Sequence, residues 1–263
     1  MKAKQNKNDQ KIIYYTDELN DEFSTAQIVP RKIDETYKYG DGSLWWHIKH
    51  RFWLCLYAPC AALYLRFKWH HKIVNRKCLK KISRKQPFFM FANHTNPVAD
   101  AFIPTFVVRP KNTFVIVHPN NVSMPVIGKI NPYVGAIPLP DNMPATKNFM
   151  NTIKLRVQEN AVIHIYPEAH IWPFYTGIRP FADTSFRYPI QYNTPVFCFT
   201  NTYQKRRFFK TPKLVTYVDG PFFADPDLPA KEQRSQLRDA VYNTMCERSK
   251  NSNVDLIKYL KKE

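Results

Sequence analysis

Short runs of about five apolar residues, separated by stretches with helical character, constrain this chain's fold more than any other feature. Such runs are typical of buried strands, and their alternation with helices predicts an α/β fold: a single domain with a largely parallel central sheet flanked by helices. We expect strands over residues 87–92 (PFFMFA), 113–117 (TFVIV), 134–139, 161–166 (AVIHIY), 196–200 and 214–218. Helices are expected over residues 100–107, 124–130, 144–159 and 231–249, the last with Leu237, Val241 and Met245 on one face.

The composition supports one large domain with additions. The chain has 263 residues, of which 44% are hydrophobic, and this excludes wholesale disorder. We divide it into a polar, loosely ordered leader (1–41), a basic and aromatic segment (42–86) and the α/β domain (87–263). The five cysteines include no Cys-x-x-Cys pair, which indicates reduced thiols in a cytosolic compartment. Histidines and cysteines form no cluster with ligand spacing, so we predict no metal site.

The net charge of +18 is concentrated in one part of the sequence. No acidic residue occurs between Asp41 and Asp100, and this window holds four of the five tryptophans: Trp45, Trp46, Trp53 and Trp69. Such a basic excess indicates an anionic partner, either nucleic acid or an anionic membrane surface. The window contains eleven cations: Lys49, Arg51, Arg66, Lys68, Lys72, Arg76, Lys77, Lys80, Lys81, Arg84 and Lys85.

An apolar run from Phe52 to Leu65 lies in the middle of this window. It is shorter than the ~20 residues that a spanning helix needs, and Pro59 interrupts it. It also begins too late in the chain for a secretory signal peptide. Aromatic and basic flanks predict an N-terminal helical segment that lies on the membrane surface or re-enters it, on the cytoplasmic face of the cell membrane, as in a peripheral or monotopic protein. The alternative is a buried core helix with a solvated basic flank.

Polar residues with catalytic potential follow two of the predicted strands. Asn93 and His94 come directly after PFFMFA, and Asp100 follows at the start of the next predicted helix. A carboxylate near a histidine can hold the imidazole tautomer and stabilise the imidazolium after the ring has taken a proton. The second group, Tyr166-Pro167-Glu168-Ala169-His170, follows AVIHIY. Because chemistry in parallel sheets lies at the carboxyl ends of strands, both groups are candidate site residues.

These motifs, in this order, resemble those of the glycerolipid acyltransferase superfamily, which includes bacterial 1-acylglycerol-3-phosphate acyltransferases. The family carries an Asn-His-x4-Asp motif, a glycine-centred motif, a Phe-Pro-Glu-Gly-Thr-Arg motif and a Pro-Val strand. The resemblance covers about residues 87–200. The matching positions are Asn93, His94 and Asp100, then Gly135–Leu139, then Tyr166–His170 with Pro180-Phe181 downstream, and Pro195-Val196.

The resemblance implies an O-acyltransferase of phospholipid synthesis. Such an enzyme moves a fatty acyl chain from an acyl thioester, acyl-CoA or acyl carrier protein, to a hydroxyl of a lyso-glycerolipid such as 1-acylglycerol-3-phosphate, with no cofactor besides the thioester. It implies His94 as the general base and Asp100 as its partner, with backbone amides near Gly135 as a place for the oxyanion. The implied substrate-binding residues are Asn93, Gly135, Glu168, His170 and Arg179.

The chain departs from the family's pattern at three places. Five residues separate His94 from Asp100 instead of four, so the turn must bulge by one residue. Pro140-Asp141 stands where the second motif usually has an arginine, and Ala169-His170-Ile171 replaces Gly-Thr-Arg in the third. Arg179 is the nearest replacement cation, with Arg187 and Lys147 behind it. The usual clamp for an acceptor phosphate is therefore missing from the sequence.

Simpler interpretations remain open at this stage. His94 could merely bond a strand end, and Glu168 could be a plain carboxylate at a helix start. His70, His71, His118 and His164 are interpreted as structural or surface residues. The whole chain could instead be a basic nucleic-acid-binding protein, although no zinc finger or RNP-type motif supports it and we expect no nucleic acid. A catalytically inactive, membrane-associated scaffold is the third hypothesis, which the intact His94 and Asp100 argue against.

Overall fold

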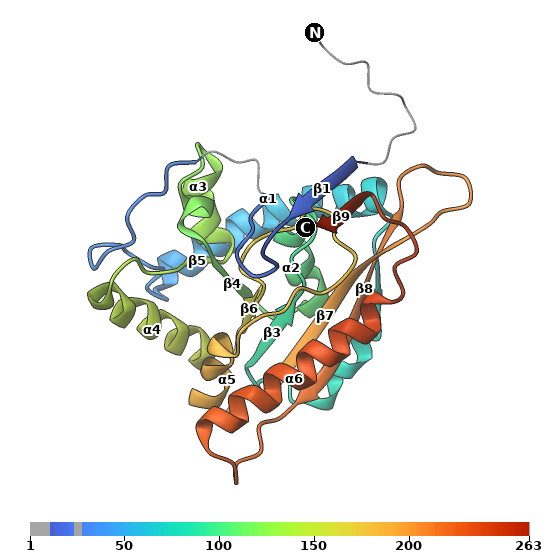
Figure 1. Cartoon of the computed structure of the whole chain (residues 1–263). Coiled ribbons are helices and arrows are strands. Elements are labelled where there is room, and N and C mark those ends of the chain that lie inside the picture. The colour runs from blue at the N-terminus through green and yellow to red at the C-terminus, as the bar shows by residue number, and fades with distance from the viewer. Residues whose placement is uncertain (1–10, 24–27, 263) are drawn as a thin grey trace.

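A seven-stranded sheet forms the centre of the fold in the computed structural model, which describes residues 11–23 and 28–262 (Figure 1). The strand order is β2-β8-β7-β3-β6-β4-β5, and all neighbours run parallel except β7 and β8. This confirms the predicted α/β class. The strands are β2 (Lys72–Val74), β3 (Phe88–Ala92), β4 (Thr113–Val117), β5 (Ala136–Pro138), β6 (Val162–Ile165), β7 (Val196–Gln204) and β8 (Lys213–Phe222).

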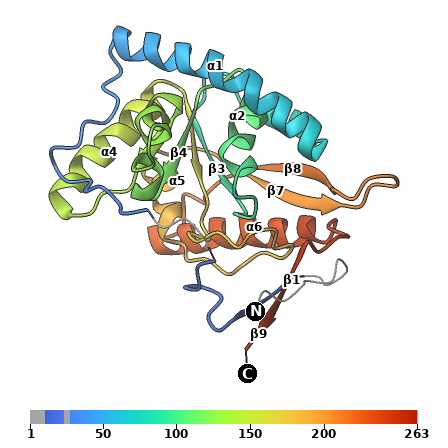
Figure 2. The same ribbon diagram turned by 90° about the horizontal axis from the view of Figure 1, so that it is seen from above.

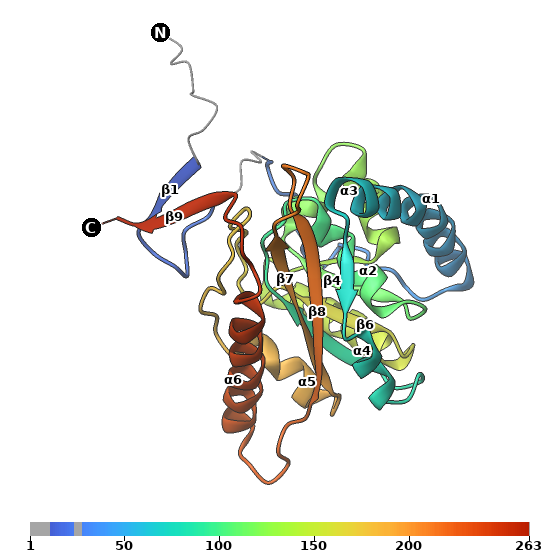
Figure 3. The same ribbon diagram turned by 90° about the vertical axis from the view of Figure 1, so that its right-hand side faces the viewer.

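Helices cover both faces of this sheet, which explains why its central strand is apolar at every position. Successive residues of a strand point to opposite faces. In β3, Phe89 and Phe91 therefore join the core on the side of α6 (Ala230–Ser249), whereas Phe88 and Met90 join the core on the side of α2 (Ile103–Val108). Figure 3 shows α6 on one side of the sheet and α1 and α2 on the other.

The long helices and the short strands agree with the sequence, whereas some boundaries differ. Helix α4 (Met143–Gln158) and α6 lie where they were expected, and Leu237, Val241 and Met245 are buried as predicted. Strands β7 and β8 extend beyond their predicted ends because they pair with each other as a long antiparallel hairpin. The predicted helix 124–130 shrinks to α3 (Ile127–Ile130). The remaining helical turns are η1 (Arg76–Lys81), η2 (Ala99–Ala101), η3 (Pro119–Val122), η4 (Asn131–Val134), η5 (Thr184–Phe186) and α5 (Arg187–Gln191).

The basic, aromatic segment forms one continuous helix, α1 (Leu44–Trp69), which passes through Pro59 without ending. The Ser43 hydroxyl accepts a hydrogen bond from the Trp46 amide at its start, a typical N-cap. His70, in a left-handed conformation, ends the helix, and the amide of His71 bonds back to Leu65 O at 3.0 Å. Within the described residues, no helix is long and apolar enough to span a bilayer.

Helix α1 is apolar on both of its sides and lies at the outside of the molecule (Figure 2). Its inner side is buried, so part of the core-helix alternative is correct. Trp46 is a core residue there, stacked on His50 and covered by the Arg156 guanidinium at 4.1 Å, and not the membrane anchor that we predicted. Its outer side exposes apolar residues three, four or seven positions apart: Trp45, Ile48, Phe52, Leu56, Leu63 and Phe67.

The leader is ordered over its described residues, contrary to the expectation of a loose segment. Strand β1 (Lys11–Tyr15) pairs in parallel with β9 (Ile257–Lys261), beside the main sheet (Figures 1 and 3). Further along, the Ile33 amide donates to the Asp141 carboxylate at 2.6 Å, and the Ile33 side chain is fully buried. Polar composition did not reveal this order because several of the leader's contacts with the rest of the molecule are made through its backbone.

Candidate active site

The two predicted groups of site residues meet at the carboxyl ends of neighbouring strands. β3 and β6 are paired, with Phe91 opposite Ile165, so the residues that follow them emerge side by side. The His94 ring stacks on the Tyr166 ring at a centroid distance of 4.5 Å. The Tyr166 hydroxyl donates to the backbone carbonyl of Asp100 at 2.6 Å. The arrangement brings the residues of the first and third motifs together in space.

His94 and Asp100 form a hydrogen-bonded pair despite the extra residue between them. His94 Nδ1 lies 2.9 Å from Asp100 Oδ2, and the His94 side chain is 26% exposed while that of Asp100 is 2% exposed. The turn closes because the same carboxylate oxygen accepts from the amides of Thr95 and Asn96, at 2.8 and 2.9 Å. A carboxylate only accepts, so the proton lies on Nδ1, and Nε2 of the neutral ring is the basic nitrogen.

The Asn93 side chain supports the His94–Asp100 pair through the backbone of β7 and is not directed at a substrate. Its buried amide bonds the backbone of Asn201 on β7 twice, donating to the carbonyl at 3.1 Å and accepting from the amide at 2.8 Å. The Asn201 side chain in turn donates to Asp100 Oδ1 at 3.1 Å. Asn201 was missed because the predicted strand ended one residue before it; an asparagine continuing an apolar strand was the available signal.

Glu168 and Arg179 form a buried ion pair next to the histidine. Glu168 Oε2 lies 3.5 Å from Arg179 Nε, and neither side chain is more than 2% exposed. Burial raises the pKa of Glu168 to about 8, although the Arg179 charge and the backbone amide of His94 oppose the shift. The Arg179 guanidinium donates to the backbone carbonyls of Glu18, Glu168 and His170. We therefore assign Arg179 a structural part in this loop, in place of the predicted contact with an acceptor.

The third motif keeps the backbone of a glycine although the residue differs. Ala169 has φ = +62°, in the left-handed region that favours glycine, at the position where the family's motif has Gly. The next residue, His170, is 37% exposed and lies 3.4 Å from the Glu22 carboxylate of the leader. His170 is thus at the surface, where it contacts the leader.

Gly135 adopts a backbone conformation that favours glycine, and it lies far from His94. Its φ is +109°, and a Cβ there would lie 2.4 Å from the Thr113 carbonyl oxygen. Its amide donates to Asn131 O at the end of η4. It precedes β5, three strands away from β3 in the sheet order. The Gly135 amide is therefore already engaged and is not free to bind an oxyanion, whereas an oxyanion site at other backbone amides near Gly135 stays a prediction.

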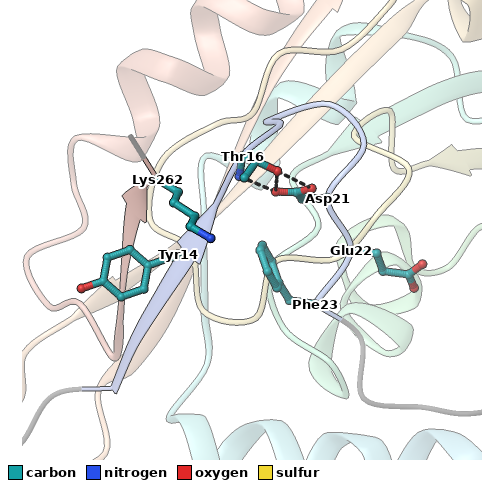
Figure 4. A pocket seen from close by; sticks show the side chains of 6 residues that line it. All are labelled: Tyr14, Thr16, Asp21, Glu22, Phe23 and Lys262. Carbon is teal, nitrogen blue, oxygen red and sulfur yellow. Dashed lines mark hydrogen bonds between the residues drawn. The ribbon is translucent and has the colours of Figure 1, made fainter.

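A pocket lies away from the His94–Asp100 pair, and no metal site is present in the described residues. An open pocket between β1 and the end of β9 is lined by Tyr14, Thr16, Asp21, Glu22, Phe23 and Lys262 (Figure 4). It has no residue in common with the His94–Asp100 pair, and its Asp21 carboxylate bonds Thr16. Across residues 11–23 and 28–262, no group of three His, Cys, Asp or Glu side chains is arranged to hold a metal.

Comparison with known proteins agrees with this geometry. Residues 73–200 match the model of the acyltransferase family, so this part of the chain belongs to that family and the protein is an O-acyltransferase. The fold is similar to that of the 1-acyl-sn-glycerophosphate (LPA) acyltransferase PlsC from Thermotoga maritima, with a TM-score of 0.57 and 14% sequence identity, over 78% of this chain and 83% of that one. No curated protein matches the sequence significantly.

We predict that Ala169→Gly raises the free energy of unfolding by up to about 1 kcal/mol, because it relieves a left-handed backbone at a residue with a Cβ. Ala161→Gly is the control: this buried alanine has no positive φ, so its loss should destabilise by about 1 kcal/mol. Urea unfolding measures both. Equal destabilisation by the two changes would contradict the interpretation.

We also predict a pH dependence that Glu168→Gln removes. Since the folded-state pKa of Glu168 is raised to about 8 from 4.5, the folded protein binds this proton more tightly than the unfolded chain. Its contribution to stability is therefore complete below the unfolded pKa and is lost as the pH rises towards 8, by at most about 1.4 kcal/mol per pH unit. Denaturant midpoints from pH 5 to 8 should fall more steeply for the wild type than for the variant.

Proposed function

We propose that this acyltransferase moves a fatty acyl chain from an acyl thioester, acyl-CoA or acyl carrier protein, to a hydroxyl of a lyso-glycerolipid such as 1-acylglycerol-3-phosphate. The observation that carries the proposal is the pair of His94 and Asp100. The ring is partly exposed while its carboxylate partner is buried, so one face of a polarised imidazole is accessible to a substrate. The Thermotoga maritima protein with a similar fold is a 1-acyl-sn-glycerophosphate acyltransferase, which supports the acceptor class.

The chemistry needs one base and no protein nucleophile. Nε2 of His94 takes the proton of the acceptor hydroxyl as the oxygen attacks the thioester carbonyl carbon. The new C–O bond forms, the C–S bond breaks, and the leaving thiolate takes the proton from the imidazolium. The products are an ester and a free thiol. Asp100 stays ionised throughout and stabilises the imidazolium between the two proton transfers.

The head group of the acceptor lipid is to be identified by experiment. The residues in place of the family's phosphate-binding arginines are otherwise engaged, since Asp141 binds the leader and Arg179 is buried. A panel of lyso-lipids with and without a phosphate monoester, offered with a labelled acyl thioester and read by lipid mass spectrometry, identifies the acceptor. Transfer to none of them would contradict the proposed function.

We propose that the enzyme docks on the anionic, cytoplasmic leaflet of the cell membrane through the outer side of α1. All eleven cations between Asp41 and Asp100 are exposed, and four of them, Lys49, Arg51, Arg66 and Lys68, lie on α1 together with its exposed apolar stripe. Each cation near an anionic surface contributes about 1 kcal/mol, and inserted apolar side chains add a contribution that salt does not screen. Docking would bring a poorly soluble acceptor and an acyl donor to the same surface.

An exposed loop next to α1 also supports docking through this side of the molecule. The hairpin between β7 and β8 carries Phe208 and Phe209, which are 81% and 61% exposed, among Lys205, Arg206, Arg207 and Lys210. The Phe209 ring lies 5.8 Å from the ring of His70, the residue that ends α1. Exposed aromatic side chains among cations are typical of loops that enter a lipid headgroup region.

Replacing the base is the direct test of the chemistry. His94→Ala should lower the rate of acyl transfer by about 10²–10⁴-fold while leaving the fold intact, as judged by circular dichroism. Asp100→Asn should lower kcat far more than it raises KM for the acyl donor, because the carboxylate acts on the base. Wild-type turnover by a folded His94→Ala protein would exclude the mechanism.

The docking proposal predicts a split between membrane and soluble substrates. Replacing Trp45, Ile48 and Phe52 together by serine should weaken binding to phosphatidylglycerol-containing vesicles by about tenfold or more. Activity on a vesicle-borne acceptor should fall, whereas activity on a short-chain soluble acceptor should persist. The matched control replaces Val29, Met143 and Phe223, which are exposed apolar residues outside α1. Complete release of the wild type by salt alone would show that the apolar stripe takes no part.

A further inference from the structure

We infer that Asn201, Thr216 and His71 form a hydrogen-bonded chain that positions the Asp100 carboxylate against His94. The inference rests on the proposed role of His94 as the base. None of these three residues belongs to the motifs that carry the family resemblance, and the sequence interpretation treated His71 as a structural or surface residue.

Each link of the chain is a short polar contact between side chains. Asn201 Nδ2 lies 3.1 Å from Asp100 Oδ1, and Thr216 Oγ1 lies 2.6 Å from Asn201 Oδ1. The same Thr216 oxygen lies 2.8 Å from His71 Nε2. Asn201 and Thr216 are 1% and 0% exposed, so water does not replace these partners. Four side chains and His94 thus form one continuous polar path through the sheet.

The chemistry of the groups fixes the direction of every hydrogen bond. The Asp100 carboxylate only accepts, so the Asn201 atom that faces it must be the NH2 group. The Asn201 oxygen then faces Thr216, whose hydroxyl proton must be donated to it. The Thr216 oxygen can consequently only accept from His71, which must carry a proton on Nε2. Burial lowers the pKa of His71 to about 4, so near neutral pH this proton belongs to an uncharged ring.

The topology of the sheet explains why these residues meet. Asn201 and Thr216 are directly opposite each other on the antiparallel strands β7 and β8. Thr216 also pairs with Ile73 on β2, and His71 directly precedes that strand. The His71 amide donates a hydrogen bond to the Leu65 carbonyl near the end of α1. The chain therefore crosses the consecutive strands β2, β8 and β7 and reaches the carboxylate beyond the end of β3.

The function of the hydrogen-bonded chain is to keep the side-chain amide of Asn201 from rotating by 180°. If the amide turned by 180°, its oxygen would face the carboxylate and repel it. With His71 protonated on Nε2, the Thr216 hydroxyl opposes this turn: it donates to the amide oxygen in the observed orientation, whereas after the turn it would face donors at both the amide nitrogen and His71. With Asn201 held, Oδ1 of Asp100 is anchored and Oδ2 is directed at His94. Thr216 and His71 are thus positioning residues, since they act through Asn201 and Asp100.

Three variants separate positioning from ordinary packing. Thr216→Val removes the hydroxyl at constant shape and should lower kcat about tenfold, with KM values for donor and acceptor changed by less than about twofold. Thr216→Ser restores the hydroxyl and should recover most of kcat. The matched control is Thr202→Val: Thr202 is equally buried on β7, but its hydroxyl bonds only the Val215 carbonyl. The control should lose stability and keep kcat.

A measurement without substrate tests the chain independently of the proposed reaction. In protein labelled with ¹⁵N-histidine, the Nδ1 proton of His94 gives a signal that His94→Ala removes. Thr216→Val should shift or broaden this signal, whereas Thr202→Val should leave it in place. If Thr216→Val does not fold, His71→Phe, at the half-buried end of the chain, should produce a smaller change in the same direction.

The outcomes distinguish the inference from the proposed function. If folded Thr216→Val, or His71→Phe, shows an unchanged His94 signal and wild-type kcat, the inferred positioning role of these hydrogen bonds is wrong. A kcat loss no larger than that of Thr202→Val would lead to the same conclusion. If His94→Ala still transfers acyl chains while Thr216→Val shifts the Nδ1 signal, the base assignment fails and the hydrogen-bonded chain stands.

Discussion

The buried carboxylate of Asp100 is the interaction on which the arrangement of the site depends. It accepts four hydrogen bonds: from the His94 ring, from the amides of Thr95 and Asn96, and from the Asn201 side chain. A buried carboxylate is tolerated only when it is so fully bonded. These donors come from the turn after β3 and from β7, while Tyr166 at the end of β6 bonds the Asp100 backbone. The Asp100 carboxylate therefore joins the turn after β3 to β7, and the Asp100 backbone joins both to the end of β6.

The sequence predicted the parts of the fold that depend on local pattern. The apolar runs at β3 and β6 identified the sheet, and the residues after them identified the His94–Asp100 pair, because both signals occupy contiguous positions. Partners that are distant in the sequence were not predictable. Asn201 is 101 residues from Asp100, and only the pairing of β7 with β3 brings them together. The engagement of Arg179 and of the Gly135 amide likewise depends on backbone carbonyls, which leave no trace in residue identity.

Helix α1 shows a different limit of sequence patterns. A helix with one apolar side is recognised by its periodicity, but α1 is apolar on its core-facing and outward-facing sides alike, so the period is hidden. Pro59 was expected to interrupt the segment, yet it is exposed and the helix continues through it. The tryptophans divided between the two sides, with Trp46 and Trp69 in the core and Trp45 outside. Composition gave their number, and only the structure separates their roles.

The contacts of the leader have a consequence for the order in which the molecule folds. Trp172 donates to the Asp21 carbonyl and Arg179 to the Glu18 carbonyl, across sequence separations of 151 and 161 residues. Contacts between such distant segments form late, because closing long loops costs conformational entropy before any contact repays it. Strand β1 must also wait for β9, since the two strands pair in parallel near opposite ends of the chain. During synthesis on the ribosome, the leader's contacts with the loop after Glu168 therefore form late, and the β1–β9 pair forms only after β9 has emerged.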